Sequence, residues 1–198
     1  MMIKIMLLSL IWVFVIALNG SISHAQGLTK GAERLMTVEE LLKSDYETIR
    51  VNFDTSKGSF LLFIYPEIAP LSVENFLRLV NSGFYDGIKV HRVVEGFVMQ
   101  AGEVPEKSPK ASLIKEFSDE VNLVHHEPGT VSFAKLYDTE KKQYLRNSAS
   151  AQFFINLGDN TRLDENFTVF GVVKWGMETV EKIEVGDEII RAYVVTPL

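Results

Sequence analysis

The residues Val90-His91-Arg92-Val93-Val94-Glu95-Gly96-Phe97-Val98-Met99-Gln100-Ala101-Gly102 decide the fold of this chain. Two apolar segments rich in β-branched residues flank Glu95-Gly96, which predicts two strands joined by a tight turn. Arg92 and Gln100 interrupt this apolar pattern. A guanidinium in such a strand either pairs with a buried carboxylate or faces a dry pocket whose ligand accepts hydrogen bonds. The hairpin by itself leaves both interpretations open.

The N-terminal residues 1–25 have the features of a secretory signal peptide. Lys4 precedes the apolar run Ile5 to Leu18, and Ser23-His24-Ala25 forms a small-x-small cleavage pattern. The apolar run is short against the ~20 residues that span a bilayer, although a retained anchor is the alternative. We therefore expect a periplasmic or secreted protein whose mature chain starts near Gln26.

The composition excludes several classes of function. A formal net charge of −6 is unfavourable for a nucleic-acid partner. The chain has no cysteine, so disulfides, thiol catalysis and thiolate metal sites are excluded. An exported chain without disulfides relies on one hydrophobic core, and this chain is long enough to bury one.

The chain after the signal peptide divides into an N-terminal extension, residues 26–48, and a single β-rich domain, residues 49–198. The extension is polar, and Thr37 begins a helix-compatible stretch that we expect to lie outside the core. The domain contains short segments with strand character, separated by turns. They span residues 49–54, 59–65, 90–94, 97–102, 129–134, 151–156, 168–173 and 189–196.

Two helices are predicted within this domain. Ser72 is expected to cap the first, whose apolar residues recur at helical spacing until Ser82-Gly83 ends it. The second is expected from Met177 to Ile183. Many short strands and only two helices favour a mainly β fold, a closed or nearly closed antiparallel barrel with the helices capping it.

The common motifs of hydrolysis, phosphate binding and helical metal ligation are absent from the sequence. His125 and His126 are adjacent and would point to opposite faces of an extended chain. A solvated turn is therefore favoured over a metal site for this pair. We predict no metal and no cofactor.

The strand that begins at Gln152 offers residues for a binding site. Alternation places Gln152 and Phe154 on one face and Phe153 on the other. Phe154 could simply pack while Gln152 satisfies backbone groups. However, Arg92, Gln100 and Gln152 are all unusual in apolar strands, and together they suggest one polar spot on a hydrophobic surface.

Seven short motifs follow one another in a characteristic order. They are Asn75-Phe76, Gly83-Phe84-Tyr85-Asp86-Gly87, His91-Arg92-Val93, Gly96-Phe97-Val98-Met99-Gln100-Ala101-Gly102, Gly129-Thr130-Val131-Ser132-Phe133-Ala134, Ala151-Gln152-Phe153-Phe154-Ile155 and Val169-Phe170-Gly171. In this order they resemble the cyclophilin-type peptidyl-prolyl cis/trans isomerases. The resemblance covers residues 49–198 and implies a closed eight-stranded antiparallel barrel capped by two α-helices.

The resemblance also implies roles for individual residues. Arg92 would be the principal catalytic residue, and Gln100 would help to orient it and the substrate. Phe97 and Phe154 would form the proline pocket, while the role of His91 is less direct. The implied substrate-binding residues are His91, Phe97, Val98, Ala134, Lys135, Gln152, Phe154, Leu163 and Phe167.

Several residues depart from the family pattern. Lys135 stands at a usual asparagine, Arg162 at a frequent tryptophan and Phe167 at a frequent histidine. The segment 136–150 is longer than the corresponding family loop and contains several basic residues. Its positive charge would either favour acidic clients or simply be solvated.

These residue types are sufficient for proline isomerisation. Amide resonance gives an X-Pro bond a rotation barrier of ~18–20 kcal/mol, and rotation localises the lone pair of the prolyl nitrogen. A guanidinium donor aimed at that nitrogen binds the twisted state better than either planar state. We therefore expect an isomerase that assists folding of exported proteins. The alternative is a cyclophilin-fold binding module or chaperone with little or no turnover.

The expected partners follow from this activity. The clients are proline-containing polypeptides. Neither nucleic acid nor stable membrane insertion after signal cleavage is expected. The chain is expected to act as a monomer.

Overall fold

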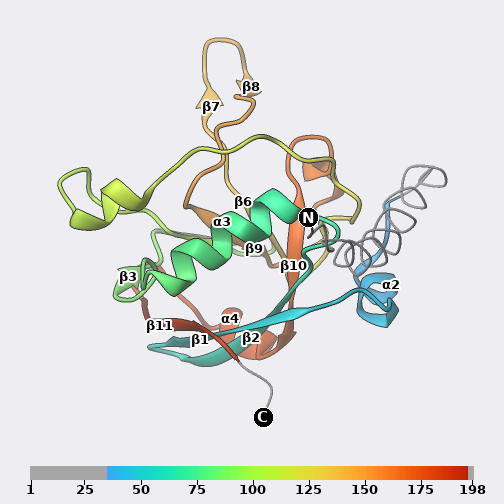
Figure 1. Cartoon of the computed structure of the whole chain (residues 1–198), viewed down its shortest axis with the longest axis horizontal. Helices are drawn as coiled ribbons and strands as arrows, with labels where there is room; N and C mark the ends of the chain where they lie inside the picture. Colours follow the sequence, from blue (N-terminus) through green and yellow to red (C-terminus); the bar gives the residue numbers. More distant parts are fainter. Residues whose placement is uncertain (1–34, 196–198) are drawn as a thin grey trace, which may run out of the picture. The chain divides into compact units, whose positions relative to one another are not determined.

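Residues 35–195, which the computed structural model describes, form one antiparallel nine-stranded sheet, a small second sheet and a few short helices (Figure 1). The large sheet has the order β3 (Ile88–Lys89), β11 (Glu188–Val194), β1 (Ile49–Thr55), β2 (Gly58–Ile64), β10 (Val169–Trp175), β6 (Thr130–Phe133), β9 (Phe153–Asn156), β5 (Val98–Ala101) and β4 (Arg92–Val94). The small sheet pairs β7 (Tyr137–Asp138) with β8 (Gln143–Tyr144). The helices are α2 (Val38–Lys43), α3 (Pro70–Asn81), α4 (Met177–Val180) and two 3-10 turns, η1 (Pro109–Leu113) and η2 (Thr161–Leu163).

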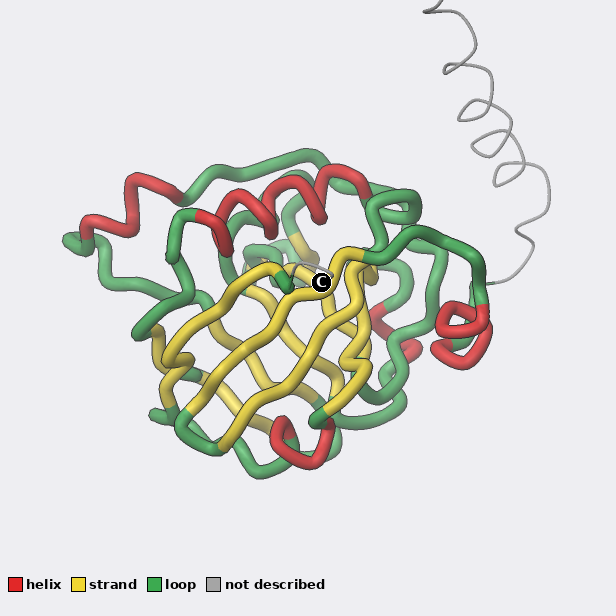
Figure 2. The backbone as a smooth tube through the Cα atoms, turned by 60° about the horizontal axis from the view of Figure 1, so that its bottom comes forward, coloured by secondary structure: helices red, strands yellow, loops and turns green. Residues whose placement is uncertain are grey.

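The two edge strands of the large sheet are consecutive in the chain. Only Val90 and His91 separate β3 from β4, although these strands stand at opposite ends of the sheet order. The Val90 N–H donates to the Asp187 carbonyl at 2.8 Å, and the His91 N–H donates to the Gln100 carbonyl at 3.3 Å. Two consecutive residues therefore bond first to the residue that precedes β11 and then to β5, and the sheet curls back on itself (Figure 2). The predicted mainly β antiparallel fold is confirmed. Strand β4 lies within the strand predicted over residues 90–94, whereas β3 precedes that range and was not predicted.

Aromatic side chains fill the inside of the curled sheet. Phe53 and Phe60 stack from neighbouring strands, with ring centroids 5.0 Å apart. Helix α3 contributes Phe76, whose ring lies 5.0 Å from Phe170 and 5.9 Å from Phe153. All five side chains are buried, and each contributes roughly 1.5–3 kcal/mol through burial. Helix α3 thus packs over the sheet through the core.

The N-terminus of α3 is capped from a distant loop. The prediction that Ser72 is the N-cap is wrong, because the helix begins at Pro70 and Ser72 lies in its first turn. Ala69, the actual N-cap, makes no side-chain capping bond. Instead, the carboxylate of Glu120 accepts hydrogen bonds from the Leu71 N–H at 2.7 Å, the Ser72 N–H at 2.8 Å and the Ser72 hydroxyl at 2.6 Å. An anion at this end also interacts favourably with the helix dipole.

The described part of the N-terminal extension packs into the domain. Its predicted helix start is confirmed, since Thr37 and Glu40 form a capping box at α2. However, Leu41 is fully buried in the main core, and the Met36 N–H donates to the Leu123 carbonyl at 2.8 Å. The prediction that this segment lies outside the core is therefore wrong for residues 35–48. The predicted signal peptide, residues 1–25, lies outside the described residues.

Two further elements differ from expectation in detail. Helix α4 ends at Val180 rather than Ile183, and the chain continues through hydrogen-bonded turns to the buried Ile183. The long segment 136–150 contains the β7–β8 hairpin, which projects from the domain (Figure 1). Among the described residues, no helix is long and apolar enough to cross a membrane.

The capping interaction predicts a stability effect. Replacing Glu120 with alanine should lower the free energy of unfolding by about 1–2 kcal/mol, because three donors at the start of α3 lose their acceptor. Urea denaturation followed by circular dichroism measures this change. The matched control is Glu116→Ala, since Glu116 is exposed in the same loop. Equal stability of the two variants would contradict the proposed role of Glu120.

Candidate functional site

A small cavity of about 140 Å³ lies beside β4, β5 and β9. It is lined by Arg92, Phe97, Val98, Gln100, Ala134, Lys135, Tyr144, Phe154, Leu163 and Phe167. All of these except Tyr144 are residues singled out from the sequence. The cavity is smaller than the ~300–1,000 Å³ of pockets for drug-sized ligands, so it suits a single side chain.

Strand register brings the central residues of this cavity together. Arg92 on β4 is directly opposite Gln100 on β5, and Gln100 is directly opposite Phe154 on β9. Directly opposed residues project to the same side of a sheet. Arg92, Gln100 and Phe154 therefore form a row on one face. The predicted alternation is confirmed, because Phe153 lies in the main core while Phe154 belongs to a separate apolar cluster.

A short chain of hydrogen bonds orients the arginine. The Arg92 Nη1 donates to Gln100 Oε1 at 3.2 Å, and Gln100 Nε2 donates to Gln152 Oε1 at 2.8 Å. Gln152 thus supports Gln100 without lining the cavity. Arg92 is exposed, and within residues 35–195 no carboxylate forms an ion pair with it. The interpretation of Arg92 as one half of a buried ion pair is therefore wrong, and its remaining N–H donors are available to a ligand.

The apolar wall is a cluster separate from the main core. Val98, Phe154, Leu163 and Phe167 are its buried members. The rings of Phe154 and Phe167 meet edge to face, with centroids 5.3 Å apart. Such a wall excludes water from one side of the cavity and strengthens polar interactions made there.

Cationic side chains surround this apolar wall. The guanidinium carbon of Arg92 lies 5.4 Å from the centre of the Phe97 ring, and that of Arg162 lies 4.7 Å from it. Lys135 forms an ion pair with Asp119 at 2.9 Å, and its Nζ lies 6.0 Å from the Phe167 ring. Of the departures from the family pattern, Arg162 therefore places a cation on the Phe97 ring, whereas the charge of Lys135 is paired with Asp119.

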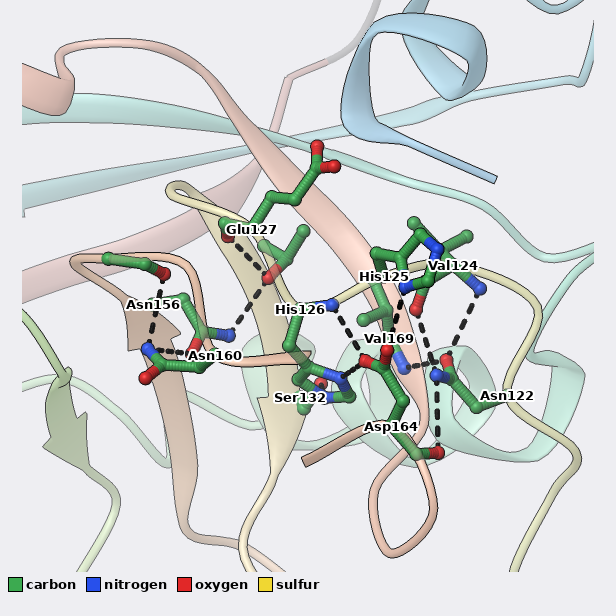
Figure 3. Close-up of polar contacts among 12 residues, drawn as sticks. Asn122, Val124, His125, His126, Glu127, Ser132, Asn156, Asn160, Asp164 and Val169 are labelled. Carbon is green, nitrogen blue, oxygen red and sulfur yellow. Dashed lines mark hydrogen bonds and ion pairs between the residues drawn. The ribbon is translucent and has the colours of Figure 1, made fainter. Parts of the chain in front are cut away.

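Phe154 packs against a polar network of His125, His126, Ser132 and Asp164, and Figure 3 shows the hydrogen bonds of this network. The His126 ring stacks on Phe154 with centroids 6.1 Å apart. Its Nδ1 lies 2.7 Å from Asp164 Oδ1, and its Nε2 lies 3.0 Å from the hydroxyl of Ser132. His125 Nδ1 also lies 2.7 Å from Asp164, at Oδ2. The prediction of a solvated turn at these histidines is wrong, because the Asp164 carboxylate holds both imidazoles.

The protonation states in this network follow from burial and hydrogen bonding. Burial lowers the pKa of His126, against the opposing effect of Asp164. Burial alone would raise the pKa of Asp164, but hydrogen bonds from His125 and His126 lower it overall. A neutral His126 donates from Nδ1 to Asp164 and accepts from the Ser132 hydroxyl at Nε2.

Ser132, His126 and Asp164 share the hydrogen-bond order of a serine hydrolase triad. However, the side chains of Ser132 and His126 are fully buried, so no substrate reaches the hydroxyl. The network therefore supports the cavity wall. Among the described residues, no group of three or more histidine, aspartate or glutamate side chains is placed to hold a metal ion.

A second polar cluster fixes the turn that carries Phe97, and Figure 3 shows its Asn156 and Asn160 side chains. The amide of Asn160 donates to the Phe97 carbonyl at 2.9 Å and to Asn156 Oδ1 at 3.0 Å. The backbone of Gly158 lies against that of Gly96, since a Cβ at Gly158 would lie 2.2 Å from the Gly96 carbonyl oxygen. This position therefore requires glycine, and the turn and its phenylalanine are held rigidly.

His91 lies outside the small cavity. It lines a larger neighbouring hollow of about 710 Å³, together with Glu103 and Lys110. Burial lowers the pKa of His91, and the Glu103 carboxylate opposes this shift. Of the residues singled out from the sequence, only His91 and Gln152 are not part of the cavity lining.

Sequence reasoning missed Tyr144. This residue lies on β8 of the hairpin and packs edge to face on Phe167, with centroids 4.6 Å apart. The segment around it is polar and charged, so no local pattern marked it as part of a binding site. The one available indication of a binding role was that an aromatic residue stands within a polar insertion.

The chain is similar in sequence and in fold to known proteins. A family model described as cyclophilin type peptidyl-prolyl cis-trans isomerase/CLD matches residues 50–194. Peptidyl-prolyl cis-trans isomerase A of Dickeya dadantii is 37% identical over 135 residues, which are 65% of this chain and 67% of that protein. A peptidyl-prolyl cis-trans isomerase of Helicobacter pylori is 34% identical over 164 residues, 80% of this chain and 92% of that protein. The crystal structure of a Cryptosporidium parvum cyclophilin type isomerase has a TM-score of 0.63 at 20% identity, covers 77% of this chain and 100% of its own, and supports the fold.

The histidines predict that acid destabilises the fold. The pKa values of His126 and His91 are lowered from the ordinary 6.5, so the unfolded chain binds protons first as the pH falls. Stability is therefore fully present above about pH 6.5 and declines as the pH falls toward the folded pKa values. The lowered pKa of Asp164 extends this loss below pH 3.8.

Thermal unfolding between pH 8 and pH 5 measures this effect. The melting temperature should fall on acidification, and His126→Gln should reduce the slope by removing one of the groups that titrate. The variant is compared with the unmodified protein at each pH, because the substitution also changes stability at neutral pH. Identical slopes for both proteins would disprove the assignment to His126.

Proposed function

The chain belongs to the cyclophilin-type peptidyl-prolyl cis-trans isomerase family, and from this membership we propose that it accelerates X-Pro bond rotation at the cavity around Arg92. One observation carries the assignment of the site. Arg92 presents an exposed guanidinium, oriented by Gln100, beside a small cavity with an apolar wall. This arrangement combines a fixed hydrogen-bond donor with room for one apolar ring.

The cavity binds the prolyl ring against its aromatic and aliphatic wall. Phe154 and Phe167 offer ring edges and faces, and Leu163 and Val98 complete an apolar surface. The proline side chain has no polar atom, so the wall binds it by excluding water. Holding the ring still while the preceding residue turns is the first requirement for rotation about the bond.

Arg92 stabilises the twisted amide. The prolyl nitrogen accepts no hydrogen bond in the planar amide, because its lone pair is delocalised into the carbonyl. Rotation localises this lone pair, and a guanidinium N–H then donates to it. The interaction is strongest in the transition state, which is the condition for catalysis. Gln100 and Gln152 act as positioning residues, since their hydrogen bonds hold the guanidinium in place.

The energies are of the required size. Shortening an isomerisation from tens of seconds to milliseconds needs a factor of ~10⁴, or about 5.5 kcal/mol. A hydrogen bond from a charged donor contributes about 1.5–3 kcal/mol. Fixed orientation of the proline in a dry cavity supplies the remainder. No nucleophile, general base or cofactor enters this scheme.

The catalytic assignment predicts that Arg92→Ala lowers kcat/KM for a proline peptide by about 10²–10³, as for loss of a transition-state donor. Stability should change by less than about 0.5 kcal/mol, because Arg92 is exposed. A protease-coupled assay measures the activity. The control is Arg50→Ala, since Arg50 is also exposed and lies over a phenylalanine ring, Phe63, at 5.6 Å. Full activity of Arg92→Ala would refute the role of Arg92, and peptide binding without acceleration by the unmodified protein would favour a binding module.

The clients are proposed to be proline-containing segments of exported proteins, whose folding the enzyme assists in the periplasm or outside the cell as a monomer. The charged, apolar and small residues of segment 1–25 support this location. The absence of cysteine is compatible with an oxidising compartment.

Export is tested by N-terminal sequencing of the protein isolated from cell fractions. We expect the extracytoplasmic fraction to contain a chain that begins at Gln26. Substituting arginine for Ala25 should block processing and leave a larger membrane-associated form. An intact Met1 on the protein recovered from the cytoplasm would disprove export.

A further inference from the structure

The β7–β8 hairpin contributes directly to the cavity wall. Tyr144 on β8 lines the cavity and packs on Phe167 at 4.6 Å, and Phe167 in turn packs on Phe154 at 5.3 Å. The three rings form a continuous aromatic surface. The hairpin projects from the domain beyond this point (Figure 1).

The aromatic surface continues from Tyr144 to Tyr137. These two residues are directly opposite each other in the hairpin, and their ring centroids are 5.1 Å apart. Opposed residues share one face of a hairpin, so the face that carries Tyr144 toward Phe167 also carries Tyr137. Asp138 and Gln143 pair at the next position along the hairpin. The hairpin therefore has an aromatic side that is continuous with the cavity.

Part of this surface is uncovered. Tyr137 is 50% exposed. Leu136 and Leu145 are also exposed, but they are opposed at the neighbouring position, and alternation places them on the other face of the hairpin. An exposed ring that continues the aromatic lining of a binding cavity offers contact area to a bound ligand.

The hairpin is held in a defined conformation. The Leu145 N–H donates to the Leu136 carbonyl at 2.8 Å. At its base the hydroxyl of Ser148, a buried residue, accepts from the Leu136 N–H at 3.0 Å and donates to the Leu145 carbonyl at 2.8 Å. At its tip the Asp138 carboxylate accepts from the backbone N–H groups of Glu140 and Lys141. A surface ordered before binding loses little conformational entropy when a ligand binds.

We propose that the β7–β8 hairpin is part of the substrate site and selects clients with an aromatic or large apolar side chain near the proline. The proposal rests on the isomerase function proposed above. Two ring contacts, of 4.6 and 5.1 Å, separate Phe167 from Tyr137. An extended peptide covers such a span in two or three residues at ~3.3–3.6 Å each. The recognised side chain is therefore two or three residues from the proline bound in the cavity.

The chemistry of Tyr137 defines the preferred partner. A half-exposed tyrosine offers a rigid ring of large contact area, and its ring pairs favourably with another aromatic ring. A charged or very small side chain at this position of the client would leave the apolar surface exposed to water.

The test compares proline peptides with phenylalanine or alanine two or three residues before or after the proline. For the unmodified protein, kcat/KM should be roughly three- to tenfold higher with phenylalanine on one side of the proline. Tyr137→Ala should bring this ratio close to one, and Tyr137→Phe should retain it because the ring remains. The control is Trp175→Ala, since Trp175 is an aromatic residue that is 59% exposed and does not line the cavity.

The outcomes separate this proposal from the isomerase function. Equal acceleration of all peptides by the unmodified protein would overturn the hairpin proposal alone, whereas no acceleration of any peptide would overturn the isomerase function. A preference that survives in Tyr137→Ala would also overturn the role of the hairpin. Concentration-dependent dimerisation, measured by analytical ultracentrifugation and lost in Tyr137→Ala, would assign the surface to a second copy of the chain instead.

Discussion

Burial of one row of side chains holds the site in register. Val93, Met99, Ile155 and Val131 face one another across β4, β5, β9 and β6, and all four belong to or pack against the main core. Because side chains alternate along a strand, burial of this row turns the neighbouring row to the other face of the sheet. The neighbouring row is Arg92, Gln100, Phe154 and Ser132. A slip of one residue in any pairing would expose core residues and remove a member of the site from the cavity.

Polar contacts then set the exact placement of what the register brings together. Gln152 orients Gln100, which orients Arg92, while Asp164 holds His126 beneath Phe154. None of these supporting groups reacts. Their effect is to limit the positions that the guanidinium and the apolar wall can adopt, and such preorganisation is the main contribution of a protein to a reaction that needs only orientation and charge.

The N-terminal segment and the β7–β8 hairpin both contact the surroundings of the site. The Val38 N–H donates to Glu127 Oε2 at 2.8 Å, and the His125 N–H donates to the Met36 carbonyl at 2.8 Å. These two hydrogen bonds attach the loop that carries the two histidines to the start of the described chain. The hairpin adds Tyr144 to the aromatic wall of the cavity. Both additions modify the surroundings of the site and leave its central row intact.

The sequence by itself determined the features that depend on neighbouring residues. Alternating apolar residues predicted the β4–β5 hairpin and the two faces of β9, the box of Thr37 and Glu40 predicted the start of α2, and the motif order identified the family and most of the cavity lining. Only the tertiary structure decided the contacts between distant segments. Glu120 caps α3, Asp164 holds two histidines, Leu41 enters the core and Tyr144 joins the wall across long stretches of chain. The physical reason is that periodicity and capping are local, whereas burial and hydrogen bonding of these groups depend on which surfaces the complete fold brings into contact.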